Sequence, residues 1–172
     1  PAGAVLLTPT GRGPQVGAVC FGRVRDFDVT DINNMGAAMA PAAAETLLRF
    51  FARSGRRPED YDAIYTGDLG FVGSRLLLEI LQSEGLPLQN HQDCGLLLYD
   101  RARQQVKAGG SGAGCSAAVL AARILPGLAK GQLHRVLLVS TGALMSQTTF
   151  LQGESIPGIA HLVELLAPGT PV

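Results

Sequence analysis

The sequence predicts an α/β fold, with a mixed five-stranded sheet packed with helices on both faces. Strand-like runs alternate with helix-like runs along the chain, which is the pattern of a sheet covered by helices. Turns rich in glycine and proline separate many of these runs. The chain has 172 residues, of which 47% are hydrophobic, so it is long enough to bury one ordinary core. We therefore expect one domain over residues 1–172.

The first third of the chain predicts a hairpin followed by a helix. Residues 5–7 and 16–27 are strand-like, and the stretch between them contains the turn-forming run PTGRGP. Hydrophobic residues at every second position place Cys20 on the core face of the second strand. Pro41 suits the first turn of a helix over residues 42–53, which is expected to keep one face in solvent.

The remaining elements follow in an order typical of a helix-covered sheet. They are a strand at 61–65, a helix at 74–83, a mixed loop-and-strand stretch at 89–99, a helix from Cys115 to about Ala129, and strands at 136–141 and 159–166. The 74–83 helix is apolar nearly all round and is expected to be buried between layers. Pro126 should kink or split the helix that contains it.

Composition excludes several classes of protein. Lysine plus arginine equal aspartate plus glutamate at 14 each, so no net charge draws the domain to nucleic acid or to an anionic membrane. Three cysteines at irregular spacing argue against a disulfide framework and for a reducing compartment. No apolar run approaches the ~18 residues of a membrane span. We therefore expect an intracellular protein with no transmembrane segment.

Six segments of this sequence resemble the stage V sporulation protein AD family, which has a thiolase-like fold. They are residues 35–45 (MGAAMAPAAAE), 61–73 (YDAIYTGDLGFVG), 91–99 (HQDCGLLLY), 108–117 (AGGSGAGCSA), 138–144 (LVSTGAL) and 153–161 (GESIPGIAH). The resemblance is to the C-terminal half of that family and runs over nearly the whole chain. It implies an N-terminal half, absent from this chain, that packs on it about a pseudo-dyad.

The resemblance also implies a function. Family members bind dipicolinic acid, or its calcium chelate, and support its uptake into the developing spore. The expected partners are the N-terminal half, membrane-embedded sporulation proteins of the same transport system, and a second copy in a homodimer. The expected location is peripheral to the inner forespore membrane. No cofactor, metal site or nucleic-acid partner is expected.

Condensing enzymes with a thiolase-like fold provide the main alternative function. They use a cysteine from the first half and His/His or His/Asn from the second half. The turn at residues 65–68 lacks histidine, residues 110–114 have neither histidine nor asparagine, and residues 140–146 have no cysteine. We therefore expect no catalysis. An active thiolase or ketoacyl synthase that uses His91 in the run HQDC remains the alternative, and an interaction subunit without a small ligand is a third.

A glycine-rich turn predicts the ligand site. Backbone N–H groups and the positive end of the helix dipole can hold a carboxylate where the helix from Cys115 begins. The alternative is that these glycines only let the helix approach the sheet closely. Cys115 is expected to be a small packed residue without a general base beside it. The candidate residues are Gly110, Ser111, Gly112, Gly114 and Cys115, together with Asp68 after a strand and His91 in a polar turn.

Two runs superficially suggest metal sites. His91, Asp93 and Cys94 contain a zinc half-site, but no second ligand pair follows with suitable spacing. Residues 26–33 (DFDVTDIN) carry oxygen ligands but lack the glycine and closing glutamate of an EF-hand. Neither run therefore predicts a dedicated metal site.

Overall fold

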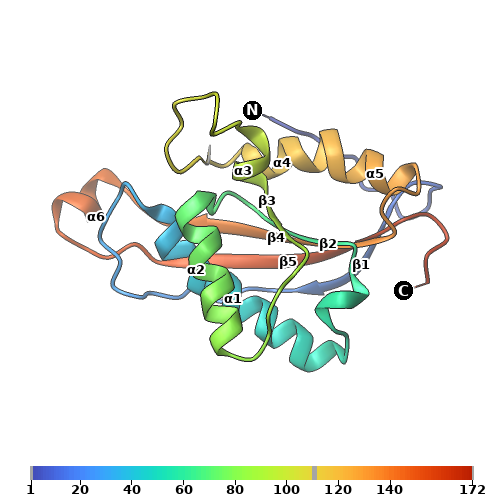
Figure 1. The fold of residues 1–172 in the computed structure, drawn as a ribbon, viewed down its shortest axis with the longest axis horizontal. Helices are drawn as coiled ribbons and strands as arrows, with labels where there is room; N and C mark the ends of the chain where they lie inside the picture. Colours follow the sequence, from blue (N-terminus) through green and yellow to red (C-terminus); the bar gives the residue numbers. More distant parts are fainter. Residues whose placement is uncertain (1, 110–111, 172) are drawn as a thin grey trace.

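The structure is a computed structural model that describes residues 2–109 and 112–171. Its centre is a five-stranded sheet in the order β1 (Gln15–Cys20), β5 (Gly158–Leu166), β4 (Arg135–Ala143), β2 (Ala63–Thr66) and β3 (His91–Asp93) (Figure 1). Strand β2 runs parallel to β3 and β4, whereas β5 runs antiparallel to β4 and β1. The mixed five-stranded sheet expected from the sequence is confirmed.

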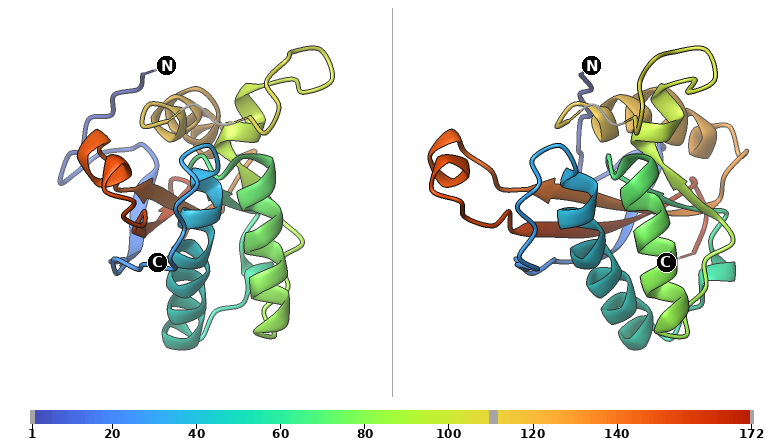
Figure 2. Two further views of the ribbon diagram at one scale, coloured as in Figure 1. Left: turned by 90° about the vertical axis from the view of Figure 1, so that its left-hand side faces the viewer. Right: turned by 60° about the vertical axis from the view of Figure 1, so that its left-hand side comes forward.

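Helices cover both faces of this sheet. On one face lie α1 (Met35–Ser54) and α2 (Gly70–Ser83), and on the other lie α3 (Cys94–Leu98), α4 (Cys115–Val119) and α5 (Leu125–Ala129) (Figures 1 and 2). A π-helical turn, Leu120–Ile124, joins α4 to α5. A short 3-10 turn, Pro58–Asp60, precedes β2, and α6 (Gln147–Leu151) lies at the tip of the β4–β5 connection. The arrangement is consistent with a thiolase-like half-unit.

The alternation of side chains along the strands creates two cores. Along β2, Ile64 packs with Leu47 and Leu77 between the sheet and the α1–α2 layer. Its neighbour Tyr65 points to the opposite face and packs with the second core, which includes Ile124 of the π-helical turn. Successive strand residues point to opposite faces, so β2 contributes to both cores. Because one core covers each face of the sheet at β2, this strand contains no exposed residue.

The predicted burial is confirmed for α1, which keeps one face in solvent, and is wrong for α2. Helix α1 begins at Met35, so Pro41 lies inside it, and its alanines are buried against β5, β4 and α2. Its solvent face carries Glu45 and Arg49, which are partly exposed, and Arg53 of the last turn, which is exposed. Helix α2 instead keeps an exposed face that includes Arg75 and Glu79. Small alanine side chains let α1 approach the sheet closely, whereas α2 needs only a leucine stripe to reach the core.

The predicted N-terminal hairpin is also wrong. Residues 2–14 form no strand, and β1 pairs with β5 instead. The segment passes α4 so closely that a Cβ on Gly3 would meet the Ala117 carbonyl oxygen at 2.2 Å. The second predicted strand ends at Cys20 rather than Phe27, although Arg25 still forms an isolated bridge to Gly158. The turn residues at 9–14 therefore mark an irregular approach to the sheet.

The later elements agree better with the sequence. Strands β4 and β5 lie where strands were predicted, and the mixed stretch at 89–99 becomes β3 followed by α3. The helix from Cys115 reaches Ala129, and the irregularity expected near Pro126 is the π-helical turn immediately before α5. That helix buries one side against the sheet, whereas Ala122 and Arg123 are exposed.

A buried glutamate ties three strands together. The Glu164 side chain on β5 is fully buried. Its carboxylate accepts hydrogen bonds from the Ala18 amide at 2.9 Å, the Tyr61 hydroxyl at 3.1 Å and Arg135 Nη1 at 2.6 Å. Burial by itself raises the pKa of Glu164, but these hydrogen bonds outweigh it and the net pKa is lowered. The carboxylate is therefore stabilised in its ionised form.

We expect Glu164→Gln to lower the free energy of unfolding by about 2 kcal/mol at pH 7, the typical value for a hydrogen bond to a charged group. A lowered folded pKa contributes stability above the unfolded pKa, and that stability is lost as the pH falls through the folded pKa. The difference between parent and variant should therefore shrink in acid. Urea unfolding at several pH values measures it, with the exposed Glu79→Gln as the control. An equal difference at all pH values would contradict this role.

Candidate functional site

A cavity of about 360 Å³ opens at the carboxyl ends of β2 and β4. The start of α1 and the loop before α4 form its other walls. Its size lies at the lower end of the range for small-molecule sites. The lining residues are Ile32, Asn33, Asn34, Met35, Gly36, Met39, Asp68, Leu69, Val72, Ala108, Gly109, Gly112, Ala113, Thr141, Gly142 and Ala143.

The pairing of β2 with β4 places Asp68 beside Thr141 in this cavity. The Gly67 amide donates to the Val139 carbonyl at 3.0 Å and continues the parallel ladder by one residue. The Asp68 amide then donates to Thr141 Oγ1, which donates to Asp68 Oδ1, both at 3.3 Å. A Cβ at Gly67 would meet Thr141 Oγ1 at 2.5 Å, so glycine is needed for this contact. These bonds fix the Asp68 carboxylate at the cavity wall.

Asp93, at the end of β3, holds the turn that contains Asp68. Its carboxylate accepts from Thr66 Oγ1 at 2.7 Å, from the Leu69 amide at 2.9 Å and from the Gly70 amide at 3.0 Å. It also accepts from the Leu96 amide at 3.2 Å. One carboxylate therefore caps the first turns of both α2 and α3. Burial raises the pKa of Asp93 to about 6, although these hydrogen bonds oppose the rise.

His91 belongs to the same network but does not line the cavity. Its Nε2 lies 2.9 Å from Thr66 Oγ1. Because the Thr66 hydroxyl donates its proton to Asp93, we infer that His91 Nε2 carries a proton and donates to Thr66. Burial lowers the pKa of His91 to about 4, so the ring is neutral at pH 7. The histidine therefore supports the capping carboxylate through Thr66.

The family model described as Stage V sporulation protein AD (SpoVAD) matches residues 1–166. The chain belongs to the SpoVAD family. It is 47% identical over 161 residues to the stage V sporulation protein AD of Bacillus subtilis (strain 168). That alignment covers 93% of this chain and 47% of the relative, so the chain spans about half the length of the curated relative it matches. Membership of SpoVAD supports a role in sporulation, and the family is named for sporulation rather than for an enzymatic activity.

The structure brings only some of the predicted SpoVAD site residues together. Asp68 and Gly112 both line the cavity. Gly114 lies just beyond it at the start of α4, and Cys115 is fully buried with its Sγ 3.9 Å from the Gly67 carbonyl oxygen. Gly110 and Ser111 lie outside the described residues.

The predicted carboxylate seat is partly occupied by the chain itself. The Cys115 amide donates to the Gly112 carbonyl at 3.0 Å, so it is not available to a ligand in this conformation. Sequence reasoning did not assign Asn33, Asn34 or Thr141 to a ligand site, although all three are polar residues of the SpoVAD cavity. The two asparagines stand immediately before α1, where polar residues are common, and Asn33 also belongs to the oxygen-rich run 26–33.

Neither a metal-binding group nor a helix suited to span a membrane occurs among the described SpoVAD residues. Within 2–109 and 112–171, no group of three or more His, Cys, Asp or Glu side chains is close enough to hold a metal. Asp26 instead accepts hydrogen bonds from the Asp28 amide and from Ser155, and Asp31 accepts from the Asn33 amide. Over the same residues, no helix combines the length and apolarity needed to cross a membrane.

Proposed function

We propose that this half of a SpoVAD protein forms one wall of a site that binds dipicolinic acid as its calcium chelate, without catalysis. The cavity at the ends of β2 and β4 carries the proposal. Its described lining combines side-chain oxygens with one charged group, the Asp68 carboxylate. Dipicolinic acid is the ligand expected from the family resemblance, and binding it serves uptake into the developing spore.

The charge of the lining favours the chelate over the free dianion. Dipicolinate carries two carboxylates on a flat pyridine ring, and Asp68 repels such an anion. The calcium chelate is neutral overall. Calcium takes six to eight oxygen ligands, so its positions beyond those filled by dipicolinate remain for protein oxygens. Asp68 and the amides of Asn33 and Asn34 are suitable donors, and the start of α4 offers its positive dipole end to a ligand carboxylate.

The nucleophilic cysteine of a condensing enzyme would come from the first half, and the residues of this chain favour a binding role. Cys94 and Cys115 are both fully buried and neither lines the cavity. Burial raises the pKa of the Cys94 thiol to about 12, so it stays protonated and is a poor nucleophile. His91 is engaged with Thr66 and does not line the cavity. Within the described lining, Asp68 is the single residue with a charged side chain.

The proposal includes the partners expected from the family. An N-terminal half supplies the facing wall of the site. Exposed apolar side chains, such as those of Leu6, Leu7, Leu144 and Leu151, form a surface that this half would bury. Delivery of the ligand involves membrane-embedded sporulation proteins of the same transport system, with this protein peripheral to the inner forespore membrane. The complete protein is proposed to be a homodimer, which light scattering tests.

Equilibrium titration of the complete two-half protein with dipicolinate, with and without equimolar calcium, tests the function. We expect saturable binding that calcium strengthens, and no acyl-enzyme in a parallel acyl-transfer assay. Asp68→Asn should weaken binding of the chelate about 10-fold and leave binding of free dipicolinate equal or stronger. Formation of an acyl-enzyme would instead establish a condensing enzyme, and no binding in either condition would favour an interaction subunit.

Two further variants test whether the backbone of the loop before α4 or the Cys115 thiol holds the ligand. Gly112 has φ +74° and faces open space, so valine there is strained and projects into the cavity. We expect Gly112→Val to weaken binding about 10-fold or more, whereas Cys115→Ser should change it by less than ~1.4 kcal/mol. Circular dichroism confirms that each variant is folded. Normal binding by folded Gly112→Val with loss in Cys115→Ser would require a thiol-centred site.

A further inference from the structure

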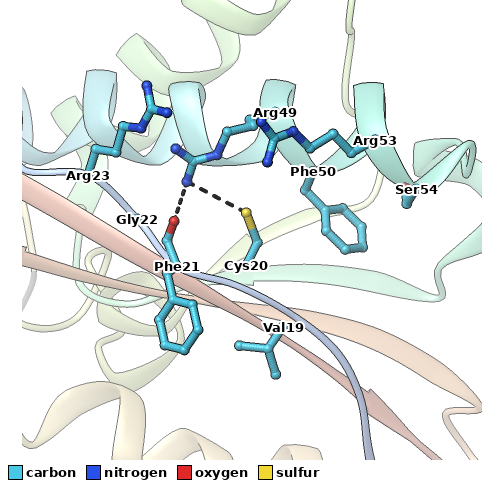
Figure 3. A pocket seen from close by; sticks show the side chains of 9 residues that line it. All are labelled: Val19, Cys20, Phe21, Gly22, Arg23, Arg49, Phe50, Arg53 and Ser54. Carbon is cyan, nitrogen blue, oxygen red and sulfur yellow. Dashed lines mark hydrogen bonds between the residues drawn. The ribbon is translucent and has the colours of Figure 1, made fainter.

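A second pocket, of about 560 Å³, lies between the end of β1 and the last turns of α1 (Figure 3). It shares no lining residue with the cavity at the ends of β2 and β4. Its charged lining residues, among those described, are three arginines: Arg23, Arg49 and Arg53. The remaining lining residues are Val19, Cys20, Phe21, Gly22, Phe50 and Ser54. The pocket therefore combines positive charge with apolar and aromatic surface.

Arg49 is held in place at the centre of this pocket. Its Nη2 donates to the Phe21 carbonyl and lies 3.6 Å from Cys20 Sγ (Figure 3). Its side chain is only 14% exposed. A guanidinium already fixed by the backbone loses little conformational freedom when it binds an anion. The pocket is therefore partly organised before any ligand arrives.

The positive charge of the pocket is only partly neutralised. Glu45 lies 3.9 Å from Arg49 Nη1, but it also forms two bonds with Arg25, so one carboxylate serves two guanidinium groups. Arg23 and Arg53 form no ion pair or side-chain hydrogen bond within residues 2–109 and 112–171. Their donors are free to meet a ligand from the open side of the pocket.

We propose that this pocket binds a phosphate group carried by a larger organic molecule. Arginine forks match the geometry of phosphate oxygens and bind them through paired hydrogen bonds. The cavity has room beyond a phosphate, and the Phe50 ring, which lies on the same side of β1 as Cys20 (Figure 3), provides an apolar wall for the attached body. The phosphate belongs either to a soluble phosphomonoester or to the headgroup of an anionic phospholipid. This site is separate from the proposed dipicolinate site.

Cys20 reports occupancy of the pocket. Its thiol is partly exposed and lies beside Arg49, whereas Cys94 and Cys115 are fully buried. The complete two-half protein is treated with iodoacetamide, and alkylation is followed by mass spectrometry on the tryptic peptide that spans residues 13–23. We expect phenyl phosphate to slow alkylation of Cys20 about 5-fold or more at saturation. Phenol, which has the same ring without phosphate, should not slow it.

Variants of the two unpaired arginines test the recognition. Arg23→Gln and Arg53→Gln should each reduce the protection by phenyl phosphate, and the double variant should abolish it. The control is Arg103→Gln, because Arg103 is 87% exposed and pairs only with its neighbour Asp100 among the described residues. Protection is expressed as the ratio of rates with and without the probe, so a changed intrinsic thiol reactivity cancels. In Arg23→Gln the reporting peptide extends to Arg25.

The two sources of phosphate are distinguished by vesicles. Protection by phosphatidylglycerol vesicles but not by phosphatidylcholine vesicles assigns the site to a lipid headgroup. Protection by phenyl phosphate alone assigns it to a soluble phosphomonoester. Three results overturn the proposal: equal protection by phenol, stronger protection by dipicolinate than by phenyl phosphate, or a Cys20 that reacts only after unfolding. The last result would mean that the other half of the protein covers the pocket.

Discussion

Replacing Asp93 with alanine is expected to lower the free energy of unfolding by about 3–5 kcal/mol, because four buried donors lose their acceptor at once. These donors are the Thr66 hydroxyl and the amides of Leu69, Gly70 and Leu96. The N-cap residue of α2 is Leu69, whose side chain cannot cap, so α2 depends on a carboxylate from β3. Urea unfolding measures the loss. A loss below 1 kcal/mol, the typical value for one neutral hydrogen bond, would contradict the double cap.

The pH dependence gives an independent measure of the same carboxylate. Its folded pKa of about 6 lies above its ordinary value of 3.8, so its contribution to stability is fully present below pH 3.8 and is lost as the pH rises through 6. His91, with a pKa lowered to about 4, acts in the opposite direction over this range. The difference between the parent and Asp93→Asn therefore isolates Asp93. It should change between pH 4 and 6 and stay constant above pH 7.

Replacing Gly36 with alanine is the second substitution with a large expected effect. Gly36 lies where α1 crosses the start of α2, and a Cβ there would meet the Leu69 carbonyl oxygen at 2.2 Å and Gly73 Cα at 3.1 Å. Both are backbone atoms, so the two helices must separate. We expect the free energy of unfolding to fall by about 3 kcal/mol, despite the better helix propensity of alanine. Because Gly36 and Leu69 both line the cavity at the ends of β2 and β4, binding of the proposed ligand should weaken as well.

Gly13→Ala provides the matched control for this substitution. A Cβ at Gly13 has no neighbour within 4 Å, and its φ is not in the left-handed region. Its stability should therefore stay the same or rise slightly, because alanine restricts the unfolded chain. If Gly36→Ala is as stable as Gly13→Ala, then α1 and α2 do not pack as tightly as the structure shows.

Local sequence patterns predicted most of the sheet but misplaced its first strand. Strand β4 was found because it contains the continuous apolar run 136–139, and β5 was found because apolar residues predominate in it despite His161 and Glu164. The pairing of β1 could not be found this way, because its partner β5 lies at the other end of the chain. The prolines and glycines at 9–14 indicated a turn, so the strand was predicted to pair with the nearest strand-like run, residues 5–7, in a hairpin.

The prediction that α2 is buried on all sides failed for a different reason. A pattern of large apolar residues predicts which face of a helix is buried, and it therefore favoured the leucine-rich α2. The alanines of α1 carry little hydrophobic weight, yet their small size lets the helix lie against both β5 and α2. Close packing rather than hydrophobicity decides the burial of α1.

The candidate site shows the same limit. Asp68 and Gly112 were found because each stands at the end of a strand or the start of a helix, where ligand groups are common. Thr141 comes from β4 and Asn34 from the turn before α1, and only the tertiary fold brings them to Asp68. An aspartate immediately before a helix is a local signal for an N-cap, and Asp93 stands immediately before α3. That the same carboxylate also caps α2 could not be read from the local sequence.

The pairing of the first strand with the last one has a consequence for synthesis of the chain. Gln15 pairs with Leu166, so β1 leaves the ribosome long before β5 exists. Until then β1 and its apolar residues Val16 and Val19 have no strand to join, while β2 and β3, which pair in parallel, can already associate through α2. Contacts between distant residues form slowly, because the intervening chain must first be ordered. The nascent chain therefore carries an unpaired strand edge until β5 emerges, and unpaired strand edges favour aggregation.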